Sequence, residues 1–227
     1  MKLKFFTAVA AISLLVAAEA ASAAIVVTNA GFEDPVVSGY NLGPITGWSQ
    51  VNPGNAVGVS GVWNPSAFGG TGLTAHSGSQ AGFAGNAPDG SFIYQNVGAL
   101  TAGNTYVLSV WVAQRLDYPL GSYEVALGTV SGSTFTAYAS ASAPIPAAGS
   151  WIQTGVTWTN SGNLTSDLYV ILVGGIGASQ AQTSFDDVSV STTADADGNV
   201  PEPASMAIWG LGAVGCAVAG YRRRKLA

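Results

Sequence analysis

The chain of 227 residues is poor in charge: 8% of its residues are charged, 48% are hydrophobic and 30 are glycine. Its basic residues lie at the two ends, and the stretch from Ala24 to Val200 has a single base, Arg115, against ten acids, a net charge of −9. Such a body cannot neutralise a run of phosphates, which excludes nucleic-acid binding, and it suits cations, neutral polar ligands or water.

Residues 1–23 have the three parts of a secretory signal peptide. Lys2 and Lys4 precede an apolar run over residues 5–18, and Ala21-Ser22-Ala23 matches a small-residue cleavage site. We therefore predict an N-terminal signal helix, cleavage after Ala23 and export of the mature chain.

Residues 24–191 are predicted to form one domain without helices. Short runs of alternating residues recur between clusters of Gly, Pro, Asn and Ser. The candidate strands are 25–27, 47–51, 57–63, 80–84, 91–97, 105–115, 123–130, 135–142, 151–159, 168–174 and 183–190. This spacing predicts an all-β fold, a single antiparallel β-sandwich, and we expect a jelly roll.

Alternation also assigns faces to the strands. Over residues 105–115 the apolar face consists of Tyr106, Leu108, Val110 and Val112. Over residues 151–159 it consists of Ile152, Val156 and Trp158. We interpret Trp48, Trp151 and Trp158 as core residues.

Short motifs along the body resemble those of the galactose-binding-like jelly rolls found among carbohydrate-binding modules. They are Asn29-Ala30-Gly31-Phe32-Glu33, Gly47-Trp48, Ser77-Gly78-Ser79-Gln80-Ala81, Gln95, Ala102-Gly103-Asn104-Thr105-Tyr106, Trp151 and Phe185-Asp186-Asp187-Val188. The resemblance implies the jelly-roll fold and, on weaker grounds, sugar binding.

The same resemblance implies a structural calcium ion. Its carboxylate ligands correspond to Glu33 and Asp186, with backbone carbonyls near Gly31 and Ser77 as helpers. Alternation places Asp186 on the core side with Val188, where an unpaired carboxylate is costly, and the body has no lysine to pair with it. Calcium would resolve this, because it binds carboxylate and carbonyl oxygens. The alternative is that Asp186 accepts backbone N–H bonds at a turn.

Sugar binding requires exposed aromatic rings and planar hydrogen-bonding side chains. Four residues opposite the apolar faces of their strands make the predicted carbohydrate site: Trp111, Arg115, Glu124 and Gln153. Further candidates are the loop aromatics Tyr40, Trp63 and Tyr118. The alternative for Trp111 is packing beneath a neighbouring loop.

Residues for catalysis are scarce. The only histidine, His76, lies outside any G-x-S-x-G motif, and the only cysteine, Cys216, lies near the C-terminus. These counts argue against a Ser-His-Asp triad and exclude a His/Cys zinc site, and no disulfide can form within the chain. A glycosidase-type carboxylate pair would require two acids distant in sequence to meet in an open groove. We predict a protein that is not an enzyme.

The C-terminal residues 201–227 follow a polar linker at 192–200. They begin with Pro201-Glu202-Pro203, continue with an uncharged apolar stretch at 205–221, and end with Arg222, Arg223, Arg224 and Lys225. A 17-residue helix rises about 25 Å, the short limit for a transmembrane helix, and the basic cluster marks its cytoplasmic end. This tail resembles the PEP-CTERM sorting signal of Gram-negative bacteria. The resemblance implies recognition by an exosortase at the inner membrane and transfer to the cell surface or an extracellular matrix.

Together these features predict an exported, surface- or matrix-associated protein that binds extracellular polysaccharide through a calcium-stabilised jelly roll. Two alternatives stay open: a structural or adhesive matrix component without a specific ligand, and, as the weaker one, an exported glycan hydrolase.

Overall fold

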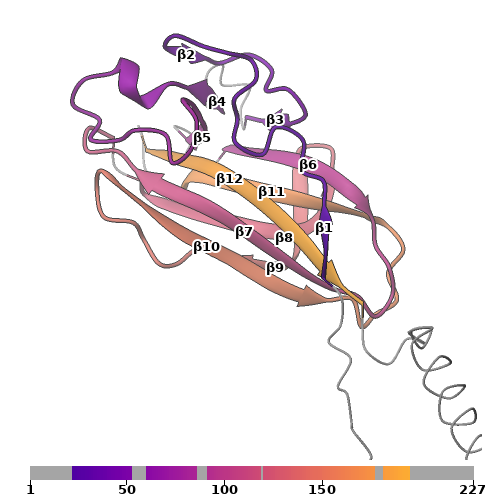
Figure 1. The fold of residues 1–227 in the computed structure, drawn as a ribbon. Coiled ribbons are helices and arrows are strands. Elements are labelled where there is room, and N and C mark those ends of the chain that lie inside the picture. The colour runs from indigo at the N-terminus through magenta and orange to yellow at the C-terminus, as the bar shows by residue number, and fades with distance from the viewer. Residues whose placement is uncertain (1–21, 53–59, 86–90, 119, 177–180, 195–227) are drawn as a thin grey trace, which may run out of the picture.

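The computed structural model describes residues 22–52, 60–85, 91–118, 120–176 and 181–194, which fold into two layers of antiparallel strands (Figure 1). The seven-stranded sheet has the order β10 (Ser150–Thr159), β7 (Thr105–Gln114), β12 (Gln182–Thr193), β5 (Ala81–Gly85), β4 (Ser60–Trp63) and β2 (Tyr40–Asn41), and β1 (Ser22–Ile25) also pairs with β12. The five-stranded sheet has the order β3 (Ser49–Val51), β6 (Ser91–Ala99), β11 (Asp167–Ile176), β8 (Ser122–Ser131) and β9 (Thr134–Ala141).

The strands from β5 onward pass repeatedly from one sheet to the other, as in a jelly roll. The predicted all-β sandwich is confirmed, and each of the eleven predicted strands corresponds to an observed one. The two-residue strand β2 was missed, and one 3₁₀ turn, Pro65–Ala67, interrupts the pattern. The strand β1 begins at Ser22, so its first two residues belong to the predicted signal peptide.

The signal helix, the linker beyond residue 194 and the C-terminal helix with its sorting residues lie outside the described residues. Within the described part of the chain, no helix has the length and apolar character needed to cross a membrane. Because β1 pairs with the end of β12, both ends of the described body lie side by side at one end of the sandwich (Figure 1).

The main core lies between the sheets. It includes the four residues that alternation assigned to the apolar face of β7, all of them buried: Tyr106, Leu108, Val110 and Val112. Trp48 is buried in this core, and Trp158 packs against its edge. Trp151 packs instead against a second cluster on the outer face of the seven-stranded sheet.

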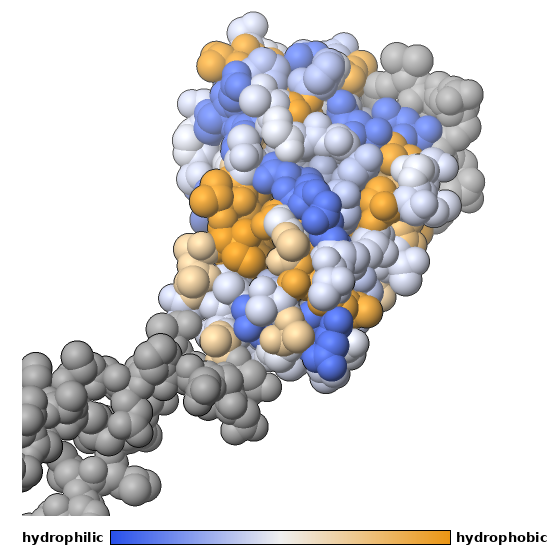
Figure 2. All heavy atoms as spheres, turned by 90° about the vertical axis from the view of Figure 1, so that its right-hand side faces the viewer, coloured by the Kyte–Doolittle hydropathy of each residue, from blue (hydrophilic) through white to orange (hydrophobic). Residues whose placement is uncertain are grey.

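The second cluster exists because residues 64–80, between β4 and β5, cover part of that outer face. Leu73 and Phe68 of this segment pack with Trp63, Phe83 and Ala113 of the sheet. Elsewhere the surface is mixed, and Figure 2 shows apolar patches separated by hydrophilic residues on one side of the molecule. Because residues 64–80 cover part of the outer face, side chains that alternation places on that face can be partly buried.

Candidate functional site

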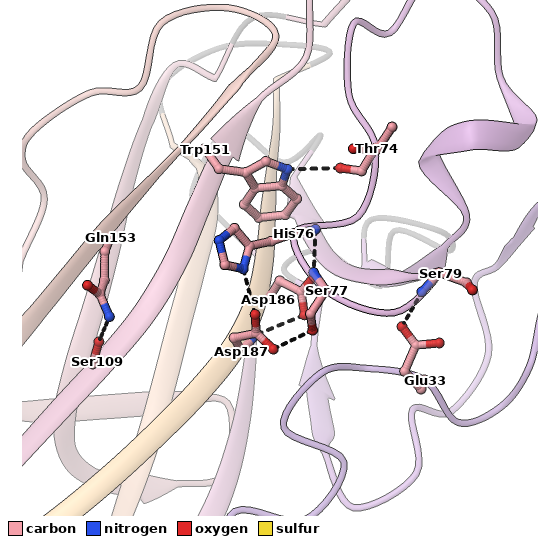
Figure 3. A network of polar contacts seen from close by, with 10 residues as sticks. All are labelled: Glu33, Thr74, His76, Ser77, Ser79, Ser109, Trp151, Gln153, Asp186 and Asp187. Atoms are coloured by element: carbon pink, nitrogen blue, oxygen red, sulfur yellow. Dashed lines mark hydrogen bonds and ion pairs between the residues drawn. The ribbon is translucent and has the colours of Figure 1, made fainter.

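The outer face of the seven-stranded sheet brings together two of the four residues predicted to bind sugar. In the strand register Trp111 lies directly opposite Gln153 on β10 and Asp186 on β12, so the three side chains share this face. The Gln153 amide donates to Ser109 Oγ at 2.8 Å (Figure 3), and both residues line a shallow hollow between β7 and β10.

The other two predicted residues lie elsewhere. Glu124 is on β8 of the five-stranded sheet, between the core residues Tyr123 and Val125, and so it faces the opposite side of the sandwich. Arg115 follows the end of β7 and points into a separate pocket. Trp111, Glu124 and Gln153 lie on the non-core sides of their strands, as alternation predicts, whereas Arg115 lies beyond the end of β7. The four residues do not converge.

The pocket that receives Arg115 has a volume of about 400 Å³ and a size and lining typical of small-ligand sites, which are about 300–1,000 Å³ and mostly apolar. Its lining residues are Tyr40, Leu42, Trp63, Phe68, Phe83, Gly85, Arg115, Tyr118, Ala181 and Gln182. All three predicted loop aromatics are among them. Phe68, Phe83 and Gln182 were missed. The pairing of β5 with β4 and β12 brings Phe83 and Gln182 to this place, and Phe68 comes from the segment that covers the sheet face.

The lining is arranged with a buried floor and an exposed rim. Trp63 and Phe83 are buried, whereas Tyr40 and Tyr118 are 61% and 37% exposed. The indole N–H of Trp63 is also buried and has no hydrogen-bond acceptor in the described part of the structure. A buried donor without a partner costs about 1–3 kcal/mol.

Arg115 is held rigidly in the pocket wall. Its guanidinium carbon lies 4.6 Å from the ring centroid of Trp63 and 4.6 Å from that of Tyr118. Its Nε and Nη2 donate to the two carboxylate oxygens of Asp117 at 2.8 and 2.5 Å, and Nη1 donates to Gln182 Oε1 at 2.8 Å. The hydrogen bond from Arg115 lowers the pKa of Asp117, so this pair stays ionised at neutral pH.

A second polar cluster lies on the same sheet face, where residues 74–80 meet β12 (Figure 3). Asp186 is fully buried and accepts three backbone N–H bonds, from His76 at 3.0 Å, Ser77 at 3.1 Å and Asp187 at 2.8 Å. These contacts agree with the alternative interpretation from the sequence, in which Asp186 accepts backbone N–H bonds at a turn. The predicted orientation toward the core is wrong, because a bulge at Asp187, with φ 47°, shifts the register and turns Asp186 to the outer face.

His76 ties this cluster to Trp111. Its Nδ1 lies 2.6 Å from Asp187 Oδ2, and its ring stacks on Trp111 with a centroid distance of 3.8 Å and an interplanar angle of 19°. The Trp151 indole N–H donates to the carbonyl of Thr74 in the same segment at 2.9 Å. Trp111 is therefore packed beneath a loop, which is the alternative considered for it.

The cluster does not form a nucleophile–base pair. Ser77 Oγ donates to Asp187 Oδ1 at 2.5 Å rather than to His76, so the imidazole does not activate this hydroxyl. Asp186 has the pKa of a general acid: burial, with a smaller contribution from the Asp187 charge, raises it to about 7 against the three N–H bonds that lower it. Its side chain is closed off from solvent, however.

The raised pKa of Asp186 makes folding stability depend on pH. A folded-state pKa of about 7 lies above the unfolded value, so the contribution of this group is fully present below about pH 4 and is lost as the pH rises to 7 and beyond. We expect the free energy of unfolding to fall between pH 5 and pH 8 by about a few kcal/mol. Urea titrations at pH 5 and pH 8 measure this difference in the free energy of unfolding. In an Asp186→Asn variant most of the difference should disappear, and an unchanged difference would contradict the assignment.

The two predicted calcium ligands, Glu33 and Asp186, both accept backbone N–H groups. Glu33 Oε1 accepts the backbone N–H groups of Ser79 and Gln80, both at 2.8 Å, beside Gly78, where a Cβ would lie 2.3 Å from that oxygen. N–H groups surround Asp186 as well, and the described residues contain no group of three or more His, Cys, Asp and Glu placed to hold a metal ion. In this structure the carboxylate oxygens of Glu33 and Asp186 therefore accept backbone N–H groups.

The protein is thus a jelly-roll β-sandwich domain with an aromatic-lined pocket on the outer face of one sheet. Residues 23–191 match the family model described as HpiC1 cyclase, and the chain belongs to this HpiC1-like family. Residues 199–225 match the PEP-CTERM protein-sorting motif, which confirms the resemblance of the tail and marks the protein for export and sorting to the cell surface. A comparison with curated proteins finds no similar sequence.

Solved structures share the fold. A cyclase from Fischerella sp. TAU in complex with 4-(1H-indol-3-yl)butan-2-one is 20% identical, with a TM-score of 0.64, and the match covers 76% of this chain and 98% of that one. The CBM22-1 xylan-binding domain of Xyn10C from Paenibacillus barcinonensis is 13% identical, with a TM-score of 0.53, and the match covers 79% and 100% of the two chains. The second likeness confirms the predicted resemblance to carbohydrate-binding modules at the level of the fold.

Proposed function

We propose that the protein is an exported, surface-associated binding protein that holds sugar units of an extracellular polysaccharide in the pocket around Arg115. The observation that carries this proposal is the lining itself, in which five aromatic rings surround one fixed guanidinium and one amide. Aromatic faces pack against the C–H face of a sugar ring, and fixed polar groups bind its hydroxyls. Such a mixture of apolar walls and few polar groups is what small-ligand sites provide.

The position of the pocket supports the same conclusion. Tyr40 stands at the rim, on the edge strand β2, so a long polymer could pass over the site while one unit enters it. The xylan-binding domain with the same fold supports a polysaccharide ligand. If no glycan binds, the alternative of a structural or adhesive matrix component is favoured.

A second candidate function is catalysis, because the family is named for a cyclase. Asp186, with its pKa of about 7, is the only residue of the described part that combines burial with such a raised carboxyl pKa. Three N–H bonds and complete burial separate it from a ligand, which is why we rank binding first. Binding of 4-(1H-indol-3-yl)butan-2-one in place of any sugar would favour the enzyme.

The test is a calorimetric titration with xylo- and cello-oligosaccharides. We expect Tyr40→Ala to weaken binding by about tenfold, which corresponds to 1.4 kcal/mol for one lost aromatic contact. The matched control is Tyr169→Ala, on the outer face of the five-stranded sheet. Loss of affinity in the Tyr169 variant, with the Tyr40 variant unaffected, would move the sugar site to the other sheet.

Calcium binding stays a proposal that rests on the resemblance of Glu33 and Asp186. Its test is a thermal melt of the chelator-treated protein with and without added CaCl₂. A rise in Tm that Asp186→Asn abolishes would support a structural calcium ion, since a ligand that binds only the folded state stabilises it. A melt that calcium and chelator leave unchanged would contradict it.

A further inference from the structure

The pocket around Arg115 has an unusual charge balance. Arg115 is the only charged residue among its described lining residues, and Asp117 neutralises it through two hydrogen bonds. The surrounding body between Ala24 and Val200 has a net charge of −9. A cationic ligand and an anionic ligand are therefore opposed by different groups of the protein.

A cationic ligand is opposed by Arg115 itself. Aromatic boxes bind cations because the cation lies over the ring faces. Here the guanidinium already lies 4.6 Å from the ring centroids of Trp63 and Tyr118. A second cation in the pocket would find these two rings occupied and would be repelled by the positive charge.

An anionic ligand is opposed by Asp117. The guanidinium binds a carboxylate best when two parallel N–H groups face both oxygens, and Asp117 occupies the Nε–Nη2 pair in this way. The remaining nitrogen, Nη1, donates to Gln182. A ligand carboxylate that took the same Nε–Nη2 position would have to displace Asp117 and leave it without its partner, and one that approached the other N–H groups would meet the negative charge of Asp117 nearby.

We propose that this pocket selects uncharged sugar units over the same units bearing a carboxylate, so that the ligand is a neutral hexose or pentose polymer and not a uronic acid polymer. The proposal rests on the proposed function, since it names the substrate class of the same pocket. Asp117 acts as a built-in competitor that occupies the carboxylate position of Arg115.

The test compares two probes of equal length: a cello-oligosaccharide and its C6-oxidised form, an oligoglucuronate. Calorimetry on the wild-type protein should show at least tenfold tighter binding of the neutral probe. Asp117→Asn removes the competing charge, and the ratio of the two affinities should fall by at least tenfold. Asp117→Ala, which removes the same charge, serves as a second variant. The Asp117 side chain is 37% exposed, so we expect both variants to fold.

The matched control is Asp167→Asn, which removes one acidic charge at the start of β11, where Asp167 accepts a hydrogen bond from Asn96. The ratio should not change in this variant. Equal or tighter binding of the acidic probe by the wild type, or an unchanged ratio in both Asp117 variants, would overturn the inference while the pocket remained a sugar site. Failure of both probes and of xylo-oligosaccharides to bind would overturn the proposed function instead.

Discussion

Replacing Gln80 by leucine is expected to destabilise the protein by about 3–5 kcal/mol, because each buried backbone group left without a partner costs about 1–3 kcal/mol. Gln80 is 1% exposed. Its amide donates to the carbonyls of Phe32 and Pro35 at 3.0 and 2.9 Å, and its carbonyl accepts the N–H of Val37. One side chain thus holds the segment that joins β1 to β2 against the start of β5.

Urea unfolding measures this effect, with the midpoint expected to fall and the slope to stay constant. The control is Gln50→Leu, because Gln50 is half-buried and its side chain makes one hydrogen bond among the described residues, to Ser60 Oγ. We expect this control to cost about 1 kcal/mol. If Gln80→Leu cost no more than Gln50→Leu, the amide would not organise the segment.

Replacing Trp63 by alanine is expected to affect both stability and binding. Trp63 is 2% exposed, forms the floor of the pocket and stacks on Arg115, so its loss should cost about 3–5 kcal/mol and should reduce sugar affinity by about a hundredfold or more. Calorimetry at a temperature where the variant is folded separates the two effects.

The control for this substitution is Trp158→Ala. Trp158 packs on the edge of the main core and stacks on Tyr138 at a centroid distance of 4.6 Å, away from the pocket. This variant should also be less stable but should bind the ligand as the wild type does. Equal loss of binding in both variants would show that affinity follows general stability and not the pocket floor.

Much of the fold could be predicted because a strand repeats every two residues. Leu108, Val110 and Val112 lie in the core as alternation requires. The same reasoning was wrong at Asp186, because a bulge there depends on the left-handed conformation of Asp187. Asp187 is not a glycine, so the sequence did not indicate this conformation. A single extra residue turned this carboxylate to the other face.

The site was harder to predict, because it depends on which strands become neighbours. Alternation put Arg115 and Glu124 on non-core faces, but Arg115 follows β7 of the seven-stranded sheet, whereas Glu124 lies on β8 of the five-stranded sheet. Phe83 carried no signal beyond being an aromatic residue in a strand. The loop aromatics Tyr40, Trp63 and Tyr118 were considered as ligand contacts, and the fold brings all three into one pocket.

The most direct test of the central claim is an NMR titration of the tryptophan indole N–H signals with a neutral xylo- or cello-oligosaccharide. The Trp63 ring lines the floor of the pocket and stacks on Arg115, so we predict that its indole signal shifts on binding. Those of Trp111 and Trp151, which lie by His76, should stay in place. Shifts at Trp111 and Trp151 with none at Trp63 would contradict the account.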